Sequence, residues 1–295
     1  MDWAERFLRL RQWTRGGERA AHKPLLILYA LGHFQRNGNT PIAFSQAEDE
    51  LRRLLRDFGP PRPTTPAYPF HHLTTDGFWM VSTAEGGGSP GASPAALRRQ
   101  DAAGRLVPEL ARDLHGDPAL LAQLAHVVLD TNFEPSLHED ICAAVGLSLE
   151  EAETGIVGEP QRRRRDPGFP RRVLIAYEYR CAFCGFDGSL DGSAPGLEAA
   201  HVRWWTHGGP NEVANGICLC SIHHKLFDKG VLGLTEQHQI TVSALFVGRS
   251  QAAERLVVSL AGQPVTPPMK GFPAVAAPFA AWHAREVFRP PARAA

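Results

Sequence analysis

Cysteine and histidine are concentrated in two short segments of the C-terminal half of the chain. Cys181 and Cys184 form a Cys-x-x-Cys pair, and after thirty-five intervening residues Cys220 and His223 repeat the same spacing. A zinc ion takes four sulfur or nitrogen ligands at tetrahedral corners, and each pair with this spacing can direct two ligands to one point. The sequence therefore predicts a structural zinc site, with His224 as an alternative fourth ligand because it also shares a helix face with Cys220.

A second group of polar residues surrounds this expected zinc site. Adjacent helical residues point about 100° apart, so His223 and His224 are not expected to bind the same ion. If His223 binds zinc, His224 faces elsewhere, together with Asp228 four residues on. His201 and Asn215 lie on the segments that lead into this helix. We therefore expect a second site built from these residues.

Residues 175–232 resemble the HNH, or ββα-metal, nucleases. The Cys-x-x-Cys pair and the segments AAHVRWWTHGG, NG, LCSIHH and FDKG occur in the order and at the spacings of that family. The resemblance implies that His201 is the general base for water attacking a phosphodiester and that Asn215 orients it. It also implies that His224 binds the catalytic Mg²⁺ or Mn²⁺.

One position departs from the pattern of that family. Many HNH nucleases place an aspartate directly before the base histidine as a second metal ligand, whereas this chain has Ala200 there. Glu198 or Asp228 is then expected to complete the shell of the ion. The departure also keeps open a different class of function, a non-catalytic DNA-binding protein whose zinc-stapled fold is only a platform.

Two motifs in the N-terminal half resemble the sulphur-binding domain of McrA-like type IV HNH restriction enzymes. They are HKPLLILYALG (22–32) and YPFHHLTTDGFW (68–79), and the resemblance extends over most of residues 1–157. It implies recognition of double-stranded DNA that carries phosphorothioate linkages. It also implies that Tyr68 and Pro69 form an apolar cup with His72 at its edge.

The same resemblance places positively charged residues around the modified linkage. His22 and Lys23 are expected at a helix N-terminus, where backbone N–H groups favour an anion. Arg98 and Arg99 are candidates for contacts to phosphates or base edges. Sulfur is less well hydrated than phosphate oxygen, so an apolar cup would exclude the oxygen at a cost of a few kcal/mol. A reader of a methylated base such as 5-methylcytosine remains an alternative.

The expected activity is an HNH endodeoxyribonuclease that cleaves phosphodiester bonds near the modification by metal-assisted hydrolysis. Because one HNH domain nicks a single strand, cutting both strands implies a homodimer. The formal net charge is zero. Charge is nevertheless uneven, since residues 109–160 hold eleven acids and one arginine and residues 161–180 hold seven arginines and two acids. This pattern is compatible with a polyanion bound on one face.

The sequence patterns around these residues predict helices and strands of an α+β protein. We expect a mainly helical N-terminal sulphur-binding domain over 1–157, an arginine-rich linker over 158–168 and a zinc-stapled ββα-metal (HNH) domain over 169–295. Helices are expected over 23–37, 47–59, 220–228 and 278–289, with helical patterns from 94 to 153. Strands are expected around 70–73, 77–82, 197–205 and 230–243.

Composition excludes two other classes of protein. The longest apolar run, Leu25 to Leu31, is far too short to span a bilayer. The first residues carry charges and no smooth apolar stretch, which is not typical of a signal peptide. Four of the five cysteines fall within forty residues, which favours metal binding over a disulfide framework. We therefore expect a cytoplasmic protein that contacts no membrane.

Overall fold

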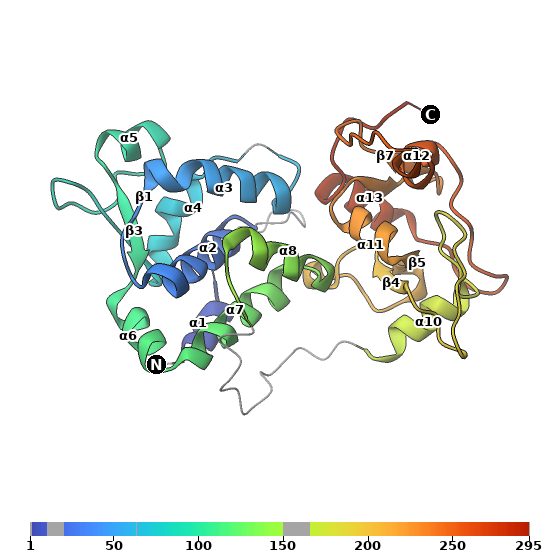
Figure 1. Ribbon diagram of the computed structural model, residues 1–295, viewed down its shortest axis with the longest axis horizontal. Coiled ribbons are helices and arrows are strands. Elements are labelled where there is room, and N and C mark those ends of the chain that lie inside the picture. The colour runs from blue at the N-terminus through green and yellow to red at the C-terminus, as the bar shows by residue number, and fades with distance from the viewer. Residues whose placement is uncertain (1, 11–20, 63, 150–165, 295) are drawn as a thin grey trace. The chain divides into compact units, whose positions relative to one another are not determined.

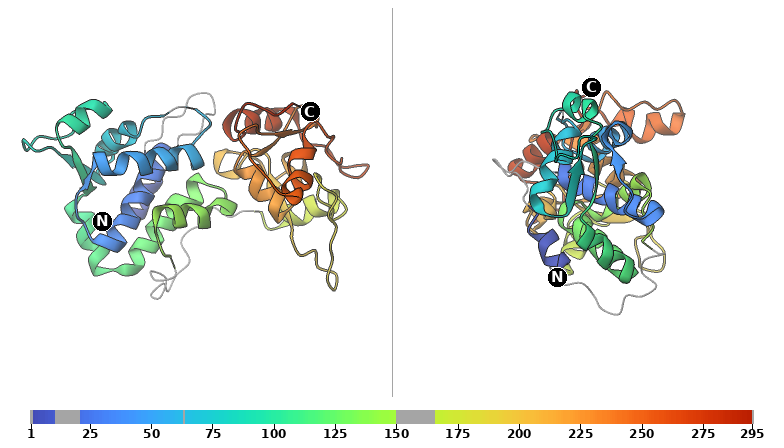
Figure 2. Two further views of the ribbon diagram at one scale, coloured as in Figure 1. Left: turned by 45° about the horizontal axis from the view of Figure 1, so that its top comes forward. Right: turned by 90° about the vertical axis from the view of Figure 1, so that its left-hand side faces the viewer.

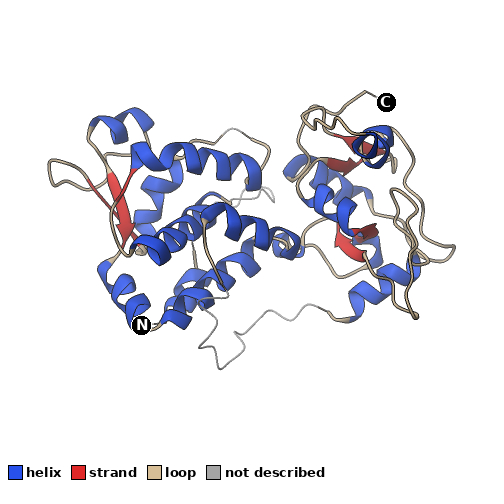
Figure 3. Ribbon diagram, in the orientation of Figure 1, coloured by secondary structure: helices blue, strands red, loops and turns tan. Residues whose placement is uncertain are grey.

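The computed structural model describes residues 2–10, 21–62, 64–149 and 166–294 (Figure 1). The chain divides into two compact units, Met1–Arg162 and Arg163–Ala295, called here the first and second units. The α+β class is confirmed, with a largely helical first unit (Figure 3). Most of the expected linker over 158–168 lies outside the described residues. No helix in the described part is long and apolar enough to cross a membrane.

Helix α2 (His22–Asn37) is the centre of the first unit. Its apolar run is nearly continuous, so residues on most of its faces are buried, including Leu25, Ile27 and Leu31. Four other helices pack against it: α3 (Phe44–Phe58), α4 (Ala67–His72), α7 (Pro118–Asn132) and α8 (Pro135–Val145). The unit is completed by α1 (Trp3–Leu8), the 3₁₀ helix η1 (Leu73–Asp76), α5 (Pro94–Arg99) and α6 (Pro108–Gly116).

The helix expected over 47–59 is present as α3 and begins three residues earlier than predicted. One face of α3 buries Leu51, Leu54 and Phe58 at helical spacing, and the helix ends before Gly59 as expected. The structure thus bears out the amphipathic pattern, while the start was misplaced because no side chain caps the N-terminus.

The strand expected around 70–73 is wrong, since these residues form the end of α4 and the start of η1. Ala67, Phe70 and Leu73 are fully buried at intervals of three residues, which is the periodicity of a helix. Pro69 lies in the first turn of α4, where a missing N–H costs no hydrogen bond. The proline-rich entry therefore starts a helix here instead of preventing one.

A three-stranded antiparallel sheet lies at one end of the first unit (Figure 3). Its order is β1 (Ile42–Ala43), β3 (Ala103–Leu106) and β2 (Trp79–Ser82). The helical pattern expected from 94 onward missed β3, which follows Asp101 in a left-handed conformation with φ 47°. Trp79 Nε1 donates to the Phe70 carbonyl at 3.0 Å and so ties the sheet to α4.

The second unit contains the expected ββα arrangement. Strands β4 (Leu197–His201) and β5 (Gly216–Cys220) pair antiparallel, with His201 opposite Gly216 and Leu197 opposite Cys220. Helix α11 (Ser221–Asp228) follows β5 directly, and α10 (Gly168–Ala176) packs against both strands (Figures 1 and 2). The strand expected over 197–205 is therefore shorter than predicted, and the helix expected over 220–228 is confirmed.

The rest of the second unit covers this core. A hairpin of β6 (Leu232–Leu234) and β7 (Ile240–Val242) occupies the region expected as strand. The expected terminal helix is α13 (Ala277–Glu286), whose buried His283 stacks on Phe227 at 3.7 Å. Burial lowers the pKa of His283 to about 4, so it packs as a neutral ring. The remaining short elements are η2 (Trp205–His207), η3 (Val213–Asn215), α12 (Gln251–Leu256) and η4 (Val258–Leu260).

Close packing of Trp79 on Gly104 gives a test of the first unit. A Cβ on Gly104 would lie 2.0 Å from Trp79 Cζ2, so the indole that binds α4 would have to move. We expect Gly104→Ala to lower the free energy of unfolding of the isolated first unit or full chain by about 1–3 kcal/mol, measured by urea denaturation. Gly88→Ala is the matched control, because nothing lies within 4 Å of its added Cβ. Equal stability of the two variants would contradict this packing.

Candidate functional site

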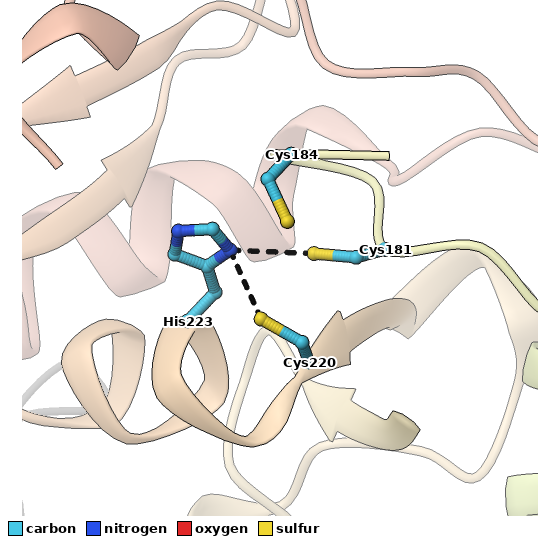
Figure 4. A group of neighbouring side chains, drawn as sticks. All are labelled: Cys181, Cys184, Cys220 and His223. Atoms are coloured by element: carbon cyan, nitrogen blue, oxygen red, sulfur yellow. Dashed lines mark hydrogen bonds between the residues drawn. The ribbon is translucent and has the colours of Figure 1, made fainter. Parts of the chain in front are cut away.

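Four side chains of the second unit converge on one point. The ligand atoms of Cys181, Cys184, Cys220 and His223 all lie within 4.8 Å of one another (Figure 4). His223 Nδ1 lies 3.4 Å from Cys181 Sγ and 3.2 Å from Cys220 Sγ. Its Nε2 lies 2.7 Å from the Leu256 carbonyl, which accepts that N–H and leaves the Nδ1 lone pair facing the sulfurs. The structure thus selects His223 over the alternative His224.

The local structure explains how these four residues meet. Cys181 and Cys184 lie on the turn after α10, Cys220 is the N-cap of α11, and His223 lies in the first turn of that helix (Figure 4). Hydrogen bonds from Cys184 and then Cys220 lower the pKa of the Cys181 thiol, which favours the thiolate that binds metal. Three sulfurs and one imidazole nitrogen at this separation fit a tetrahedral zinc ion.

His201 ends strand β4 and is held on two sides. Its ring stacks on Phe169 of α10, with centroids 4.1 Å apart and planes 13° apart. Its Nε2 lies 2.9 Å from Asn211 Oδ1. Only 8% of the residue is exposed. The resemblance did not point to Phe169 or Asn211, because neither belongs to the motif that carries it.

Asn215 is fully buried and fixes the loop between β4 and β5. Its Oδ1 accepts from the Arg203 backbone N–H at 2.8 Å, and its Nδ2 donates to the carbonyls of Arg203 and Pro210 at 2.9 and 3.0 Å. Its own carbonyl accepts from Val202, the residue after His201. The loop folds so tightly that a Cβ on Gly209 would lie 1.8 Å from the Arg203 oxygen.

His224 lies between two carboxylates. Its Nδ1 is 2.5 Å from Glu198 Oε2, and its Nε2 is 3.2 Å from Asp228 Oδ2. Asp228 is buried, and its other oxygen accepts from Trp204 Nε1 at 3.1 Å. Burial alone would lower the pKa of His224, but Asp228 and Glu198 outweigh it and raise the pKa to about 10. The hydrogen bond from His224 in turn lowers the pKa of Glu198 to about 2.

This arrangement brings both carboxylates that were expected near the second ion to the same imidazole. Ala200, where many HNH nucleases have aspartate, is buried on β4. Glu198 lies two residues earlier on that strand, and its longer side chain reaches His224. Position 200 therefore carries no charge, but Glu198 on the same strand still supplies a carboxylate.

In the first unit, Tyr68 is the exposed member of the expected cup. It is 39% exposed, and its ring centroid lies 4.3 Å from that of His72 and 6.2 Å from that of His22. His22 Nε2 lies 2.8 Å from Thr64 Oγ1. Pro69 is buried within α4, so in this conformation Tyr68 and not Pro69 offers apolar surface to solvent.

Lys23, one of the positive charges expected around the cup, has an acidic partner. His22 and Lys23 are the first two residues of α2, and Lys23 Nζ lies 2.5 Å from Asp76 Oδ2. The side chains of Lys23 and Asp76 are only 12% and 3% exposed. Burial, followed by the charges of His71 and Lys23, lowers the pKa of His72, which Asp76 partly offsets. His72 is therefore a neutral ring at pH 7.

Arg98 and Arg99 end helix α5 on the exposed side of the first unit. Arg98 Nη1 lies 2.6 Å from Glu48 Oε2, and Glu48 also pairs with Arg52. Arg98 is half exposed in this pair, so its guanidinium is shared between the protein and solvent. Arg99 is exposed.

Two family models match separate parts of the chain. A family model for the ScoMcrA-like DNA sulfur-binding domain matches residues 1–150, and an HNH endonuclease model matches residues 181–235. No curated protein matches the chain.

Several solved structures are similar to parts of the chain. The sulfur-binding domain of ScoMcrA complexed with phosphorothioated DNA is 22% identical with a TM-score of 0.43, over 52% of this chain and 99% of that chain. The corresponding SprMcrA complex is 24% identical with a TM-score of 0.41, over 50% and 95%. The type IV phosphorothioation-dependent restriction endonuclease ScoMcrA is 19% identical with a TM-score of 0.40, over 68% of this chain and 42% of that chain.

The match over residues 1–150 covers half of the sequence. The HNH match covers His201 on β4, Asn215 at the end of η3 and His224 on α11. The chain therefore belongs to the family with a ScoMcrA-like DNA sulfur-binding domain, which it combines with an HNH endonuclease domain.

Proposed function

We propose that this protein is a type IV restriction endonuclease that binds phosphorothioate-modified double-stranded DNA and hydrolyses phosphodiester bonds near the modification. One observation carries this proposal: a DNA sulfur-binding domain and an HNH endonuclease domain occur in one chain. The first domain supplies recognition of the modified linkage, and the second supplies cleavage. Since each HNH domain would cut one strand, cleavage of both strands would require two chains.

Charge alone cannot distinguish the two kinds of linkage, because phosphate and phosphorothioate carry the same charge. A free lysine at the reading surface would attract both equally. Lys23 is instead paired with Asp76, so the positive charge of Lys23 near Tyr68 is balanced by a carboxylate. A phosphate oxygen placed against the Tyr68 ring would lose its water without gaining a cation, whereas sulfur loses less hydration. This asymmetry supports selection of the sulfur.

The second unit holds the groups that hydrolysis needs. His201 would accept a proton from the attacking water, and Asn215 would keep the loop around it closed. His224 and Glu198 would bind a divalent cation, Mg²⁺ or Mn²⁺, with Asp228 orienting the imidazole from the buried side. When bound, such an ion neutralises charge on the phosphate and on the leaving oxygen. The Cys₃His cluster would hold zinc and keep α11 in place beside β4 and β5.

Sulfur recognition by Tyr68 can be tested by affinity. We expect Tyr68→Ala to weaken binding of a duplex with one stereodefined phosphorothioate about 10-fold, since an aromatic contact contributes about 1–1.5 kcal/mol. Binding of the oxygen twin should change less than about 2-fold because it does not use the cup. Tyr179→Ala is the matched control: that tyrosine is 43% exposed and lies in the second unit. Competition between the phosphorothioated duplex and a methylated duplex tests the alternative that the first domain reads a methylated base. An equal loss for sulfur and oxygen duplexes would overturn the role of Tyr68.

The role of His201 separates an enzyme from a platform that only binds DNA. We expect His201→Ala to lower the rate of cleavage of phosphorothioated plasmid with Mn²⁺ by at least about 10²-fold, as loss of a general base does. Affinity for the same DNA should be unchanged, because the first unit makes those contacts. Plasmid without the modification is the control substrate. Cleavage that survives the substitution would show that another group is the base.

Zinc binding can be tested with two cysteines of the same strand. We expect wild-type protein to contain one zinc ion per chain by elemental analysis and Cys220→Ala to lose it, with unfolding of the second unit. A structural zinc ion contributes about 10 kcal/mol or more to folding. Cys218→Ala is the control, since Cys218 is buried on β5 outside the cluster and should keep the metal. A folded, zinc-free wild-type protein would contradict the assignment.

A further inference from the structure

We propose that Asn211 is the positioning residue that fixes the tautomer of His201, so that Nδ1 is the nitrogen that accepts the proton from water. This inference rests on the proposed nuclease function. It names the group that determines which nitrogen of His201 acts as the base. The observation behind it is the 2.9 Å contact between His201 Nε2 and Asn211 Oδ1. A neutral imidazole carries one N–H, and an amide oxygen can only accept. Nε2 is therefore the protonated nitrogen, which leaves the lone pair on Nδ1.

Two different elements hold the ring in this state. Phe169 of α10 stacks on the imidazole with planes 13° apart and so sets the plane of the ring. A stack does not distinguish the two edges of the ring, because flipping the imidazole by 180° keeps the same plane. The hydrogen bond to Asn211 makes that distinction. Together they restrict a ring that is only 8% exposed to a single orientation and a single proton position.

Asn211 is itself held in place by its backbone. Its carbonyl accepts from Arg172 Nη2 of α10 at 2.9 Å, and Arg172 also pairs with Asp166 at 2.6 Å. The preceding residue, Pro210, accepts a hydrogen bond from Asn215 Nδ2. Asn215 thus acts on His201 through the loop: it fixes Pro210, which places the amide of Asn211 against the ring.

An aspartate at position 211 gives a direct test, because a carboxylate has the same shape but stabilises the protonated ring. A nearby carboxylate raises the pKa of a histidine by about 1–3 units. The base must be unprotonated, so the acid limb of the rate profile should move to higher pH by at least about one unit in Asn211→Asp. The rate is measured as single-turnover nicking of phosphorothioated plasmid with Mn²⁺ at saturating protein.

The controls separate a local effect from added charge. The double variant Asn211→Asp with Glu212→Gln keeps the net charge of the loop, and we expect the same shift. Glu212→Gln alone should leave the profile where it is in wild type. Asn211→Ala should lower the nicking rate about 10-fold or more across the pH range, as loss of an orienting partner does, with unchanged DNA affinity. Superimposable profiles for wild type and Asn211→Asp would overturn the proposal.

A second measurement does not depend on activity. In protein with ¹⁵N-labelled histidine, the signal that His201→Gln removes should report the Nε2–H tautomer in wild type and a mixture of tautomers in Asn211→Ala. An Nδ1–H tautomer in wild type would overturn the inference even if no variant cuts DNA. If wild-type protein fails to nick modified plasmid, the proposed function fails; if it nicks and the tautomer is wrong, only the role of Asn211 fails.

Discussion

The Cys₃His cluster is the constraint on which the second unit depends. It lets a helix of only eight residues and a two-stranded sheet hold the candidate site residues in fixed positions. An isolated helix of such length is unstable in water. Cys220 and His223 attach the first turn of α11 to the Cys181–Cys184 turn, so the helix begins at a fixed point and direction. His224 is the next residue, and Asp228 is one turn further. Once the first turn is fixed, both follow.

The adjacent histidines therefore face different groups although they lie on the same helical turn. A rotation of about 100° per residue directs His223 to the sulfurs and His224 to Glu198 and Asp228. Each imidazole is oriented by an acceptor on the side away from its expected ligand: the Leu256 carbonyl for His223 and Asp228 for His224. Asn211 has the same relation to His201. In the proposed mechanism, each of the three rings would therefore have its reactive nitrogen selected by a neighbouring acceptor. Asp228 belongs to the HNH motif, whereas Leu256 and Asn211 do not.

These orienting partners show where prediction from sequence stops. Contacts between residues close in sequence followed from spacing: the Cys-x-x-Cys and Cys-x-x-His pairs, the i, i+4 pair of His224 and Asp228, and the buried face of α3. Lys23 and Asp76 are 53 positions apart, and only the fold reveals that they form an ion pair. Asn211 was hidden because its loop is irregular, and periodicity carries no information there. The strand expected at 70–73 failed for another reason, since apolar residues three apart fit a helix and the prolines were taken as a barrier to one.

The two candidate sites differ in charge, and each arrangement fits the ligand proposed for it. Around Tyr68, Asp76 neutralises the charge of Lys23, and the lowered pKa of His72 favours its neutral form. An anion at this surface would therefore meet polarisable rings, and the charge of Lys23 would already be balanced. Around His224, two carboxylates face one imidazole, so the site concentrates negative charge where a divalent cation is expected. If the first surface carried a free cation, it would bind every phosphate, and sulfur would confer little advantage. If the second lacked its carboxylates, an imidazole alone would be a poor ligand set for an ion that prefers oxygen. For the proposed function, selectivity for the modified linkage would therefore depend on how completely Asp76 neutralises Lys23, because that pairing leaves hydration as the main difference between the two linkages.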